Sequence, residues 1–123
     1  MNELPADVRL PPLLERISDY VDYYARLMPQ AEAMVLDDRR IDFAEQKRRV
    51  DDVARALIAA GVEHGDRVAT LSTPHPDFWV LFLASASIGA IWVGLNPRYK
   101  LDEYRYVVGD CEPCLLFTRT RIG

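Results

Sequence analysis

The stretch RVATLSTPHPDFWVLFLASASIGAIWVGLNP, residues 67–97, decides the fold. Residues 67–72 and 90–95 are short apolar runs of strand length, and residues 77–88 between them form an apolar segment of helix length. The order strand, helix, strand is typical of a unit in which two parallel strands are joined by a crossover helix.

Residues 78–97 contain no charged side chain and are long enough to raise the alternative of a membrane span. Five small or polar residues interrupt the run: Ser85, Ser87, Gly89, Gly94 and Asn96. We expect a buried helix followed by a buried strand, because parallel strands that are covered on both faces read as continuous apolar runs.

The alternation continues towards the C-terminus. After a loop at residues 96–100, the pattern predicts a helix from Leu101 to Val108, with Leu101, Tyr104, Val107 and Val108 on one side. A third strand is expected from Cys114 to Thr118. Residues 62–123 therefore form an expected βαβαβ unit with a parallel sheet, which places the chain in the α/β class.

Two smaller segments precede this unit. In residues 1–30, apolar side chains recur on one face of a helix that Pro29 ends; they are Leu13, Leu14, Ile17, Tyr20, Val21, Tyr24 and Met28. Residues 31–61 predict a short hairpin, Ala33–Leu36 with Arg39–Asp42, and then a second helix.

Asp42 is placed to cap this second helix, with Glu45 three residues on, and Gly61 ends it. Its predicted apolar face consists of Phe43, Val50, Val53, Ala54, Leu57 and Ile58. The charged run at 47–52 is expected on the solvated face.

Composition narrows the class of protein. The chain has 123 residues, 50% of them hydrophobic, which suits one domain, and its formal charge is -4 with acidic and basic residues interleaved. This pattern excludes the basic surface that nucleic acid or an anionic membrane selects. Met1 to Pro12 contain no apolar core of signal-peptide type, so we expect a cytoplasmic protein.

Catalytic and metal sites are not visible in the sequence. No glycine pair forms the complete motif of a phosphate-binding loop, and His64 and His75 are expected to be solvent-exposed turn residues. Cys111 and Cys114 form a C-x-x-C, which is compatible with a redox dithiol or half a zinc site. We interpret them as ordinary thiols, because the first ends a predicted helix and the second begins a predicted strand.

Several short motifs nevertheless resemble, in order, the N-terminal region of the adenylate-forming superfamily, which includes acyl-CoA synthetases. The motifs are Ile41 to Glu45 at a helix start, Ala56-Leu57 with Gly61-Val62, GDRVA at 65–69, Gly89-Ala90, LNPR at 95–98, and Glu103-Tyr104. The chain departs from the family pattern at Gln46, Pro74 and Gly94. The resemblance covers about Leu14 to Phe117.

The resemblance implies that the chain is part of the large N-terminal domain of an acyl-CoA synthetase or fatty acid-CoA ligase. Similar enzymes use ATP and Mg2+ to convert a carboxylate into an acyl-adenylate, and transfer the acyl group to coenzyme A. In the family, the groups that bind ATP come from later residues, so this chain alone is expected to bind no cofactor and not to be catalytic. The partner that the resemblance implies is the remainder of the ligase chain. The resemblance does not distinguish among fatty, aromatic and short-chain acids as the acid that is activated.

In parallel sheets, ligands approach the carboxyl ends of the strands, which here means the loops at 72–76, 94–99 and 118–123. Gly94, Asn96 and Arg98 are the candidate residues for an approach by coenzyme A, because Arg98 offers a cation to a phosphate-bearing ligand. The alternative is that these residues only end a strand. Asp66 is expected to brace a turn through hydrogen bonds.

Two functional hypotheses follow. In the first, the chain is a fragment of an acyl-CoA ligase. In the second, it is a stand-alone, non-catalytic association module on the same scaffold, with a homodimer formed through an open sheet edge or an apolar face.

Overall fold

The computed structural model describes residues 12–119. Its elements are α1 (Asp19–Leu27), β1 (Glu32–Leu36), β2 (Arg39–Asp42), α2 (Phe43–Ala59), β3 (Arg67–Leu71), α3 (Pro76–Ser87), β4 (Ile91–Leu95), α4 (Leu101–Cys111) and β5 (Leu115–Thr118). The predicted alternation of strands and helices from residue 67 onward is confirmed. Residues 1–11 and 120–123, with most of the segment on which the prediction about a signal peptide rests, lie outside the described residues.

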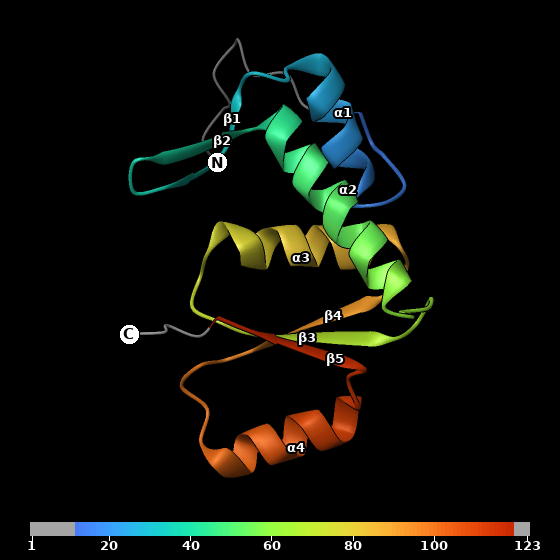
Figure 1. Ribbon diagram of the computed structural model, residues 1–123, viewed down its shortest axis with the longest axis vertical. Coiled ribbons are helices and arrows are strands. Elements are labelled where there is room, and N and C mark those ends of the chain that lie inside the picture. The colour runs from blue at the N-terminus through green and yellow to red at the C-terminus, as the bar shows by residue number, and fades with distance from the viewer. Residues whose placement is uncertain (1–11, 120–123) are drawn as a thin grey trace, which may run out of the picture.

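The molecule is layered around a three-stranded sheet. The strand order is β4-β3-β5, and both pairs are parallel, with Val68 of β3 opposite Trp92 of β4 and Leu115 of β5. Helices α2 and α3 lie on one side of this sheet and α4 lies on the other (Figure 1). The α/β class with a parallel sheet is therefore confirmed.

Helix α1 begins later than predicted. It starts at Asp19, whose carboxylate accepts a hydrogen bond from the backbone N–H of Arg16 at 3.0 Å and closes a turn before the helix. Leu13 is 98% exposed, because it lies outside the helix and no described segment covers it. Of the predicted apolar face, Val21 is buried and the Tyr24 ring stacks on Phe43 of α2, whereas Ile17 and Met28 are exposed.

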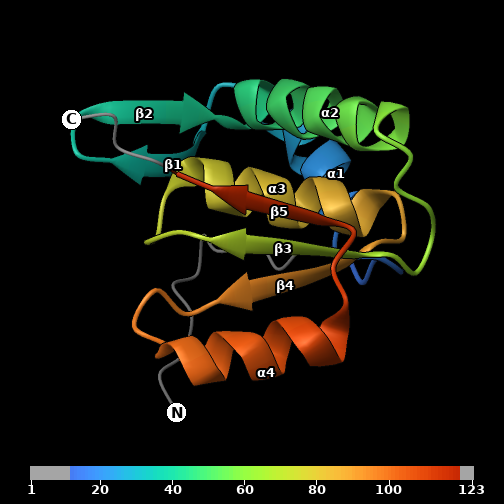
Figure 2. The ribbon, with the colours of Figure 1, turned by 60° about the horizontal axis from the view of Figure 1, so that its bottom comes forward.

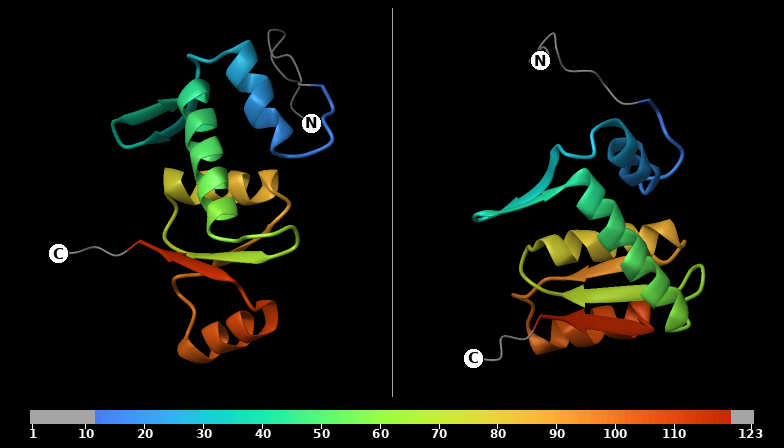
Figure 3. Two further views of the ribbon diagram at one scale, coloured as in Figure 1. Left: turned by 45° about the vertical axis from the view of Figure 1, so that its right-hand side comes forward. Right: turned by 45° about the horizontal axis from the view of Figure 1, so that its top comes forward.

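The hairpin of β1 and β2 is confirmed, with Asp37 in the left-handed region (φ 53°) at its turn. Together with α1 it lies on the far side of α3 from the sheet (Figure 3). Asp42 caps α2 as predicted, since its Oδ1 accepts from the N–H of Glu45 at 2.8 Å. The Glu45 carboxylate pairs with Arg49 instead of completing a capping box.

Helix α2 ends in a Schellman motif at Gly61, which has a φ of +92°. The N–H of Val62 donates to the carbonyl of Leu57 and that of Gly61 to the carbonyl of Ile58, both at 3.0 Å. The predicted apolar face of α2 is right for Val50 and Leu57 but wrong for Ile58, which is 59% exposed. Ile58 is one residue, or about 100° of helix rotation, past buried Leu57.

The uncharged run forms α3 and β4, as predicted. Val80, Leu81, Leu83 and Ala84 of α3 are buried in the core with Val68 of β3. Within residues 12–119, no helix is long and apolar enough to cross a membrane. The apolar character of α3 is explained by its position between the sheet and the layer formed by α2 and the hairpin.

Helix α4 is packed much less completely than α3. None of its residues is buried, and Tyr106 is 75% exposed. Tyr104 and Val107 are half-buried as predicted, whereas Leu101 and Val108 from the same predicted face are exposed. One helix is too narrow to cover this side of a three-stranded sheet, so part of the apolar surface stays open.

Candidate functional site

The carboxyl ends of β3, β4 and β5 meet at one edge of the parallel sheet (Figure 2). The chain leaves β3 for α3 on one face and leaves β4 for α4 on the other. Such a divergence is a topological switch point, where open α/β sheets place their ligand crevices. The edge predicted to hold a ligand therefore has the expected topology.

Asn96 shapes the loop after β4. Its Oδ1 accepts a hydrogen bond from the backbone N–H of Arg98 at 2.9 Å, and its carbonyl accepts from the Tyr104 hydroxyl at 2.7 Å. These bonds fix the turn into α4. The Arg98 side chain is exposed beside this turn. The structure thus gives Asn96 a structural task, and ligand contact by Asn96 or Arg98 stays a prediction.

Gly94 accommodates a neighbouring aromatic ring. A Cβ built at Gly94 would lie 2.6 Å from Cη2 of Trp92, whose indole therefore covers the glycine. Trp92 Nε1 donates to Thr70 Oγ1 at 3.1 Å, and its ring meets Phe78 edge-on with centroids 4.6 Å apart. Gly94 therefore makes room for Trp92, and its contact with a ligand stays a prediction.

The same edge contains a cavity of about 240 Å³ between β3, β5, α2 and α3. Its lining residues are Val53, Thr70, Ser72, Asp77, Phe78, Leu81, Phe117, Thr118 and Arg119. Ser72 and Thr118 belong to two of the three loops that were predicted to approach a ligand. Gly94, Asn96 and Arg98 do not line it, so the structure does not bring the predicted site residues together with this cavity.

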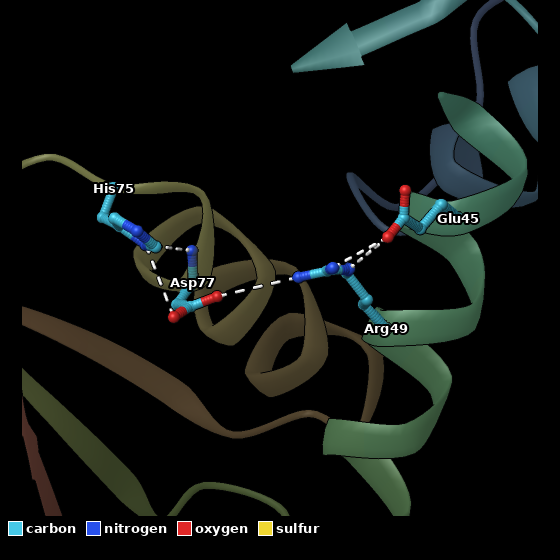
Figure 4. A network of polar contacts seen from close by, with 4 residues as sticks. All are labelled: Glu45, Arg49, His75 and Asp77. Atoms are coloured by element: carbon cyan, nitrogen blue, oxygen red, sulfur yellow. Dashed lines mark hydrogen bonds and ion pairs between the residues drawn. The ribbon is translucent and has the colours of Figure 1, made fainter. Parts of the chain in front are cut away.

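A polar network joins α2 to the start of α3 (Figure 4). Arg49 bonds Glu45 at 2.7 Å and approaches Asp77 at 3.9 Å. His75 Nδ1 accepts from the N–H of Asp77 at 3.0 Å, which makes His75 the cap of α3. The prediction that His75 is a solvent-exposed turn residue is wrong, since only 9% of its side chain is exposed.

Sequence reasoning missed this network and the Thr70–Trp92 bond. A signal for the helix start did exist, because Pro76 is followed by Asp77 and both residue types are common in a first turn. Histidine is not a usual cap residue, and no spacing rule connects Thr70 to Trp92 across two strands.

The remaining candidates have structural tasks. Asp66 braces its turn as predicted, with Oδ2 accepting from the N–H of Glu63 at 2.8 Å. His64 is exposed and its ring lies against Gly89, where a side chain would collide.

Cys111 ends α4 as predicted, and both it and Cys114 are free thiols. Among residues 12–119, no three acidic, histidine or cysteine side chains are grouped to hold a metal ion.

Lys47 shows that the charged run of α2 is more than a solvated face. Its Nζ lies 2.6 Å from Asp22 of α1 and 2.8 Å from Asp51. The hydrogen bond to Asp22, followed by that to Asp51, raises the pKa of Lys47 above its ordinary value of 10.5. This residue therefore ties α1 to α2.

The family profile described as AMP-binding enzyme matches residues 21–122, which is most of the chain. The chain therefore belongs to the AMP-binding enzyme family.

Among curated relatives, an indoleacetate–CoA ligase of Aromatoleum aromaticum is 33% identical over 105 residues, which are 85% of this chain and 21% of the relative. The mitochondrial medium-chain acyl-CoA ligase ACSF2 of Rattus norvegicus is 36% identical over 95 residues, 75% of this chain and 15% of the relative. The chain thus spans about a fifth, or less, of the length of these relatives.

Among solved structures, a putative long-chain-fatty-acid CoA ligase from Rhodopseudomonas palustris matches with a TM-score of 0.82 and 33% identity, over 85% of this chain and 26% of that one. The N-terminal domain of FACL13 from Mycobacterium tuberculosis matches with a TM-score of 0.81 and 27% identity, over 85% of this chain and 27% of that one. These structures show that the fold is that of the N-terminal domain of adenylate-forming enzymes.

Proposed function

We propose that this chain is the N-terminal scaffold of an ATP-dependent acyl-CoA ligase. The observation that carries the proposal is the family match over residues 21–122, in which acyl-CoA ligases are the relatives. The layered βαβαβ unit and its carboxyl edge are the parts that this chain contributes.

In the parent enzyme, ATP bound with Mg2+ would supply the adenylyl group and coenzyme A the accepting thiol. The residues described here do not fit ATP and Mg2+: no phosphate-binding glycine loop occurs in the sequence, and residues 12–119 hold no metal-binding cluster. We propose that the chain by itself does not activate a carboxylate, and that its task is to build and support one wall of the parent's site. The cytoplasmic location stays a prediction from the sequence.

A chimaeric enzyme tests the scaffold role. Residues 21–119 of this chain replace the matching segment of an active acyl-CoA ligase, which is the recipient. The release of AMP is then measured with the recipient enzyme's own acid. The proposal expects a folded chimaera that retains measurable activity, because the acid and ATP sites come from the recipient. A chimaera that melts cooperatively like its parent but releases no AMP would contradict it.

We further propose that Arg98 meets a phosphate group of coenzyme A, with Asn96 holding the loop and Gly94 preceding it. The proposal is supported by the exposed guanidinium at the carboxyl edge. Titration of the chain with coenzyme A, followed by amide chemical shifts, should perturb residues 94–100. Arg98→Gln should weaken the effect severalfold, whereas Arg105→Gln, at an exposed arginine of α4 paired with Asp102, should not. Equal effects of the two variants would refute the contact.

The alternative of a stand-alone association module is favoured by one observation. Strand β5 pairs only with β3 within the described residues, and Leu116 and Phe117 on it are 52% and 40% exposed. A homodimer through this edge would appear as a discrete dimeric mass in light scattering, and Leu116→Lys would convert it to a monomer. A monomer at all concentrations removes this alternative.

A further inference from the structure

The cavity at the carboxyl edge has an apolar floor and a polar rim. Its apolar walls come from three elements: Val53 of α2, Phe78 and Leu81 of α3, and Phe117 of β5. Two of these walls are aromatic rings, and the Phe78 ring is held in place by its edge-on contact with Trp92. A volume of about 240 Å³ lies below that of sites for drug-sized ligands and suits a molecule with a single ring.

Thr70 supplies an unused hydrogen-bond donor in this cavity. The residue is only 4% exposed, and its Oγ1 already accepts from Trp92 Nε1 at 3.1 Å. That bond uses an oxygen lone pair and leaves the hydroxyl proton, which donates no hydrogen bond to the residues described at 12–119. Buried donors are normally paired, so a ligand oxygen that accepts from Thr70 would be stabilised there.

The rim carries charges of both signs. Asp77 carries a negative charge, Arg49 lies 3.9 Å from it, and the exposed Arg119 adds one positive charge. These groups remain in contact with solvent, so their effect on a ligand is screened. The walls therefore select the ligand by its ring and its acceptor oxygen more than by its charge.

We propose that this cavity is a binding site for a small aromatic molecule that has one ring and a carbonyl oxygen. The ring lies between Phe78 and Phe117, and the carbonyl accepts a hydrogen bond from the Thr70 hydroxyl. Trp92 is a positioning residue, because it fixes both the Thr70 hydroxyl and the Phe78 ring. The proposal does not depend on ligase activity.

Titration of the isotope-labelled chain with benzamide tests the site. We expect saturable shifts of the amides of Thr70, Ser72, Phe78 and Thr118, with a dissociation constant on the order of 1 mM for so small a ligand. Thr70→Val keeps the shape of the side chain and removes the donor. It should weaken benzamide binding about fivefold and leave the binding of toluene, which has no acceptor, unchanged.

A second pair of variants tests the cavity if Thr70→Val fails to fold. Val53→Phe fills the cavity from α2 and should weaken benzamide binding about tenfold or more, while Ile58→Phe makes a similar change at an exposed position of the same helix and should have no effect. The proposal is overturned if benzamide causes no saturable shifts at this edge, or if it binds the Val53→Phe and Ile58→Phe variants equally.

Discussion

Gly94 owes its place in β4 to the indole of Trp92. From the sequence, a glycine just before Leu-Asn-Pro indicated either a ligand approach or the end of a strand, and no spacing rule could show that a ring two residues earlier lies across it. His75 was missed for another reason: its ring caps the helix that begins at the next residue, but histidine is not a usual cap residue. Local roles such as that of Asp66 were predictable because both partners lie within four residues.

Gly94→Ala should destabilise the chain. The new methyl group would meet Trp92, so the indole must move and lose its bond to Thr70 or its contact with Phe78. A cost of about 1–3 kcal/mol in the free energy of unfolding is expected, as for other overpacked sites. Urea unfolding measures it. Gly109→Ala, at a helical position with open space, should be neutral or stabilising, and an equal loss at both positions would refute the explanation.

Ser85→Ala should stabilise the chain. Ser85 is fully buried in α3, and its hydroxyl has no hydrogen-bond partner among the described residues. Removing the unpaired hydroxyl should raise the free energy of unfolding by about 1 kcal/mol.

Ser87→Ala is the matched control two residues away. Its hydroxyl donates to the carbonyl of Ala84 at 2.7 Å, so the same substitution removes a formed bond and should not stabilise. Thermal unfolding of both variants measures the change in stability that each substitution causes. A loss of stability in Ser85→Ala would show that its hydroxyl is paired.

At the scale of elements, the type and order of the helices and strands were predictable from residue 32 onward, because hydrophobic period, caps and prolines agreed there. The predictions were wrong where tertiary packing decides which residues are helical or buried. The start of α1 and the exposed sides of Ile58, Leu101 and Val108 depend on which surfaces neighbouring elements cover. The contact of Lys47 with Asp22 was also invisible in sequence, since it joins two helices across the hairpin.

The Lys47–Asp22 pair predicts a pH dependence. Folding raises the pKa of Lys47, mainly through its hydrogen bond to Asp22, so the stabilisation is complete below the ordinary lysine value of 10.5 and is lost as the pH rises through the raised value. Asp22→Asn should lower the free energy of unfolding by less than about 1 kcal/mol, since the pair is partly exposed.

The difference in the free energy of unfolding between the original chain and Asp22→Asn should stay constant near neutral pH. It should shrink above about pH 10.5, the ordinary pKa of lysine. Urea unfolding across this range measures it. Asp52→Asn removes an exposed carboxylate that pairs only within α2 and should show no such trend. A difference for Asp22→Asn that grows at alkaline pH would contradict the assignment.

At the scale of the molecule, the α/β class and the family were predictable, because six short motifs occur in the family's order over nearly the whole chain. Of the candidate site, only its position at the carboxyl edge of the sheet was predictable. The carboxyl ends of the strands do hold a cavity, yet its walls come from α2, α3 and β5, three elements whose approach the sequence does not encode locally. Part of the sheet's apolar surface is also open, on the α4 side and along β5.

The exchange of pyrophosphate into ATP by the purified 123-residue chain tests the central claim most directly. The chain belongs to the AMP-binding enzyme family, but its sequence contains no phosphate loop and its residues 12–119 form no metal-binding cluster. Fatty, aromatic and short-chain acids are supplied to the chain in turn. An intact acyl-CoA ligase serves as the positive control. We predict no exchange above background with any acid. Exchange that depends on the acid and is abolished by unfolding the chain would contradict the account.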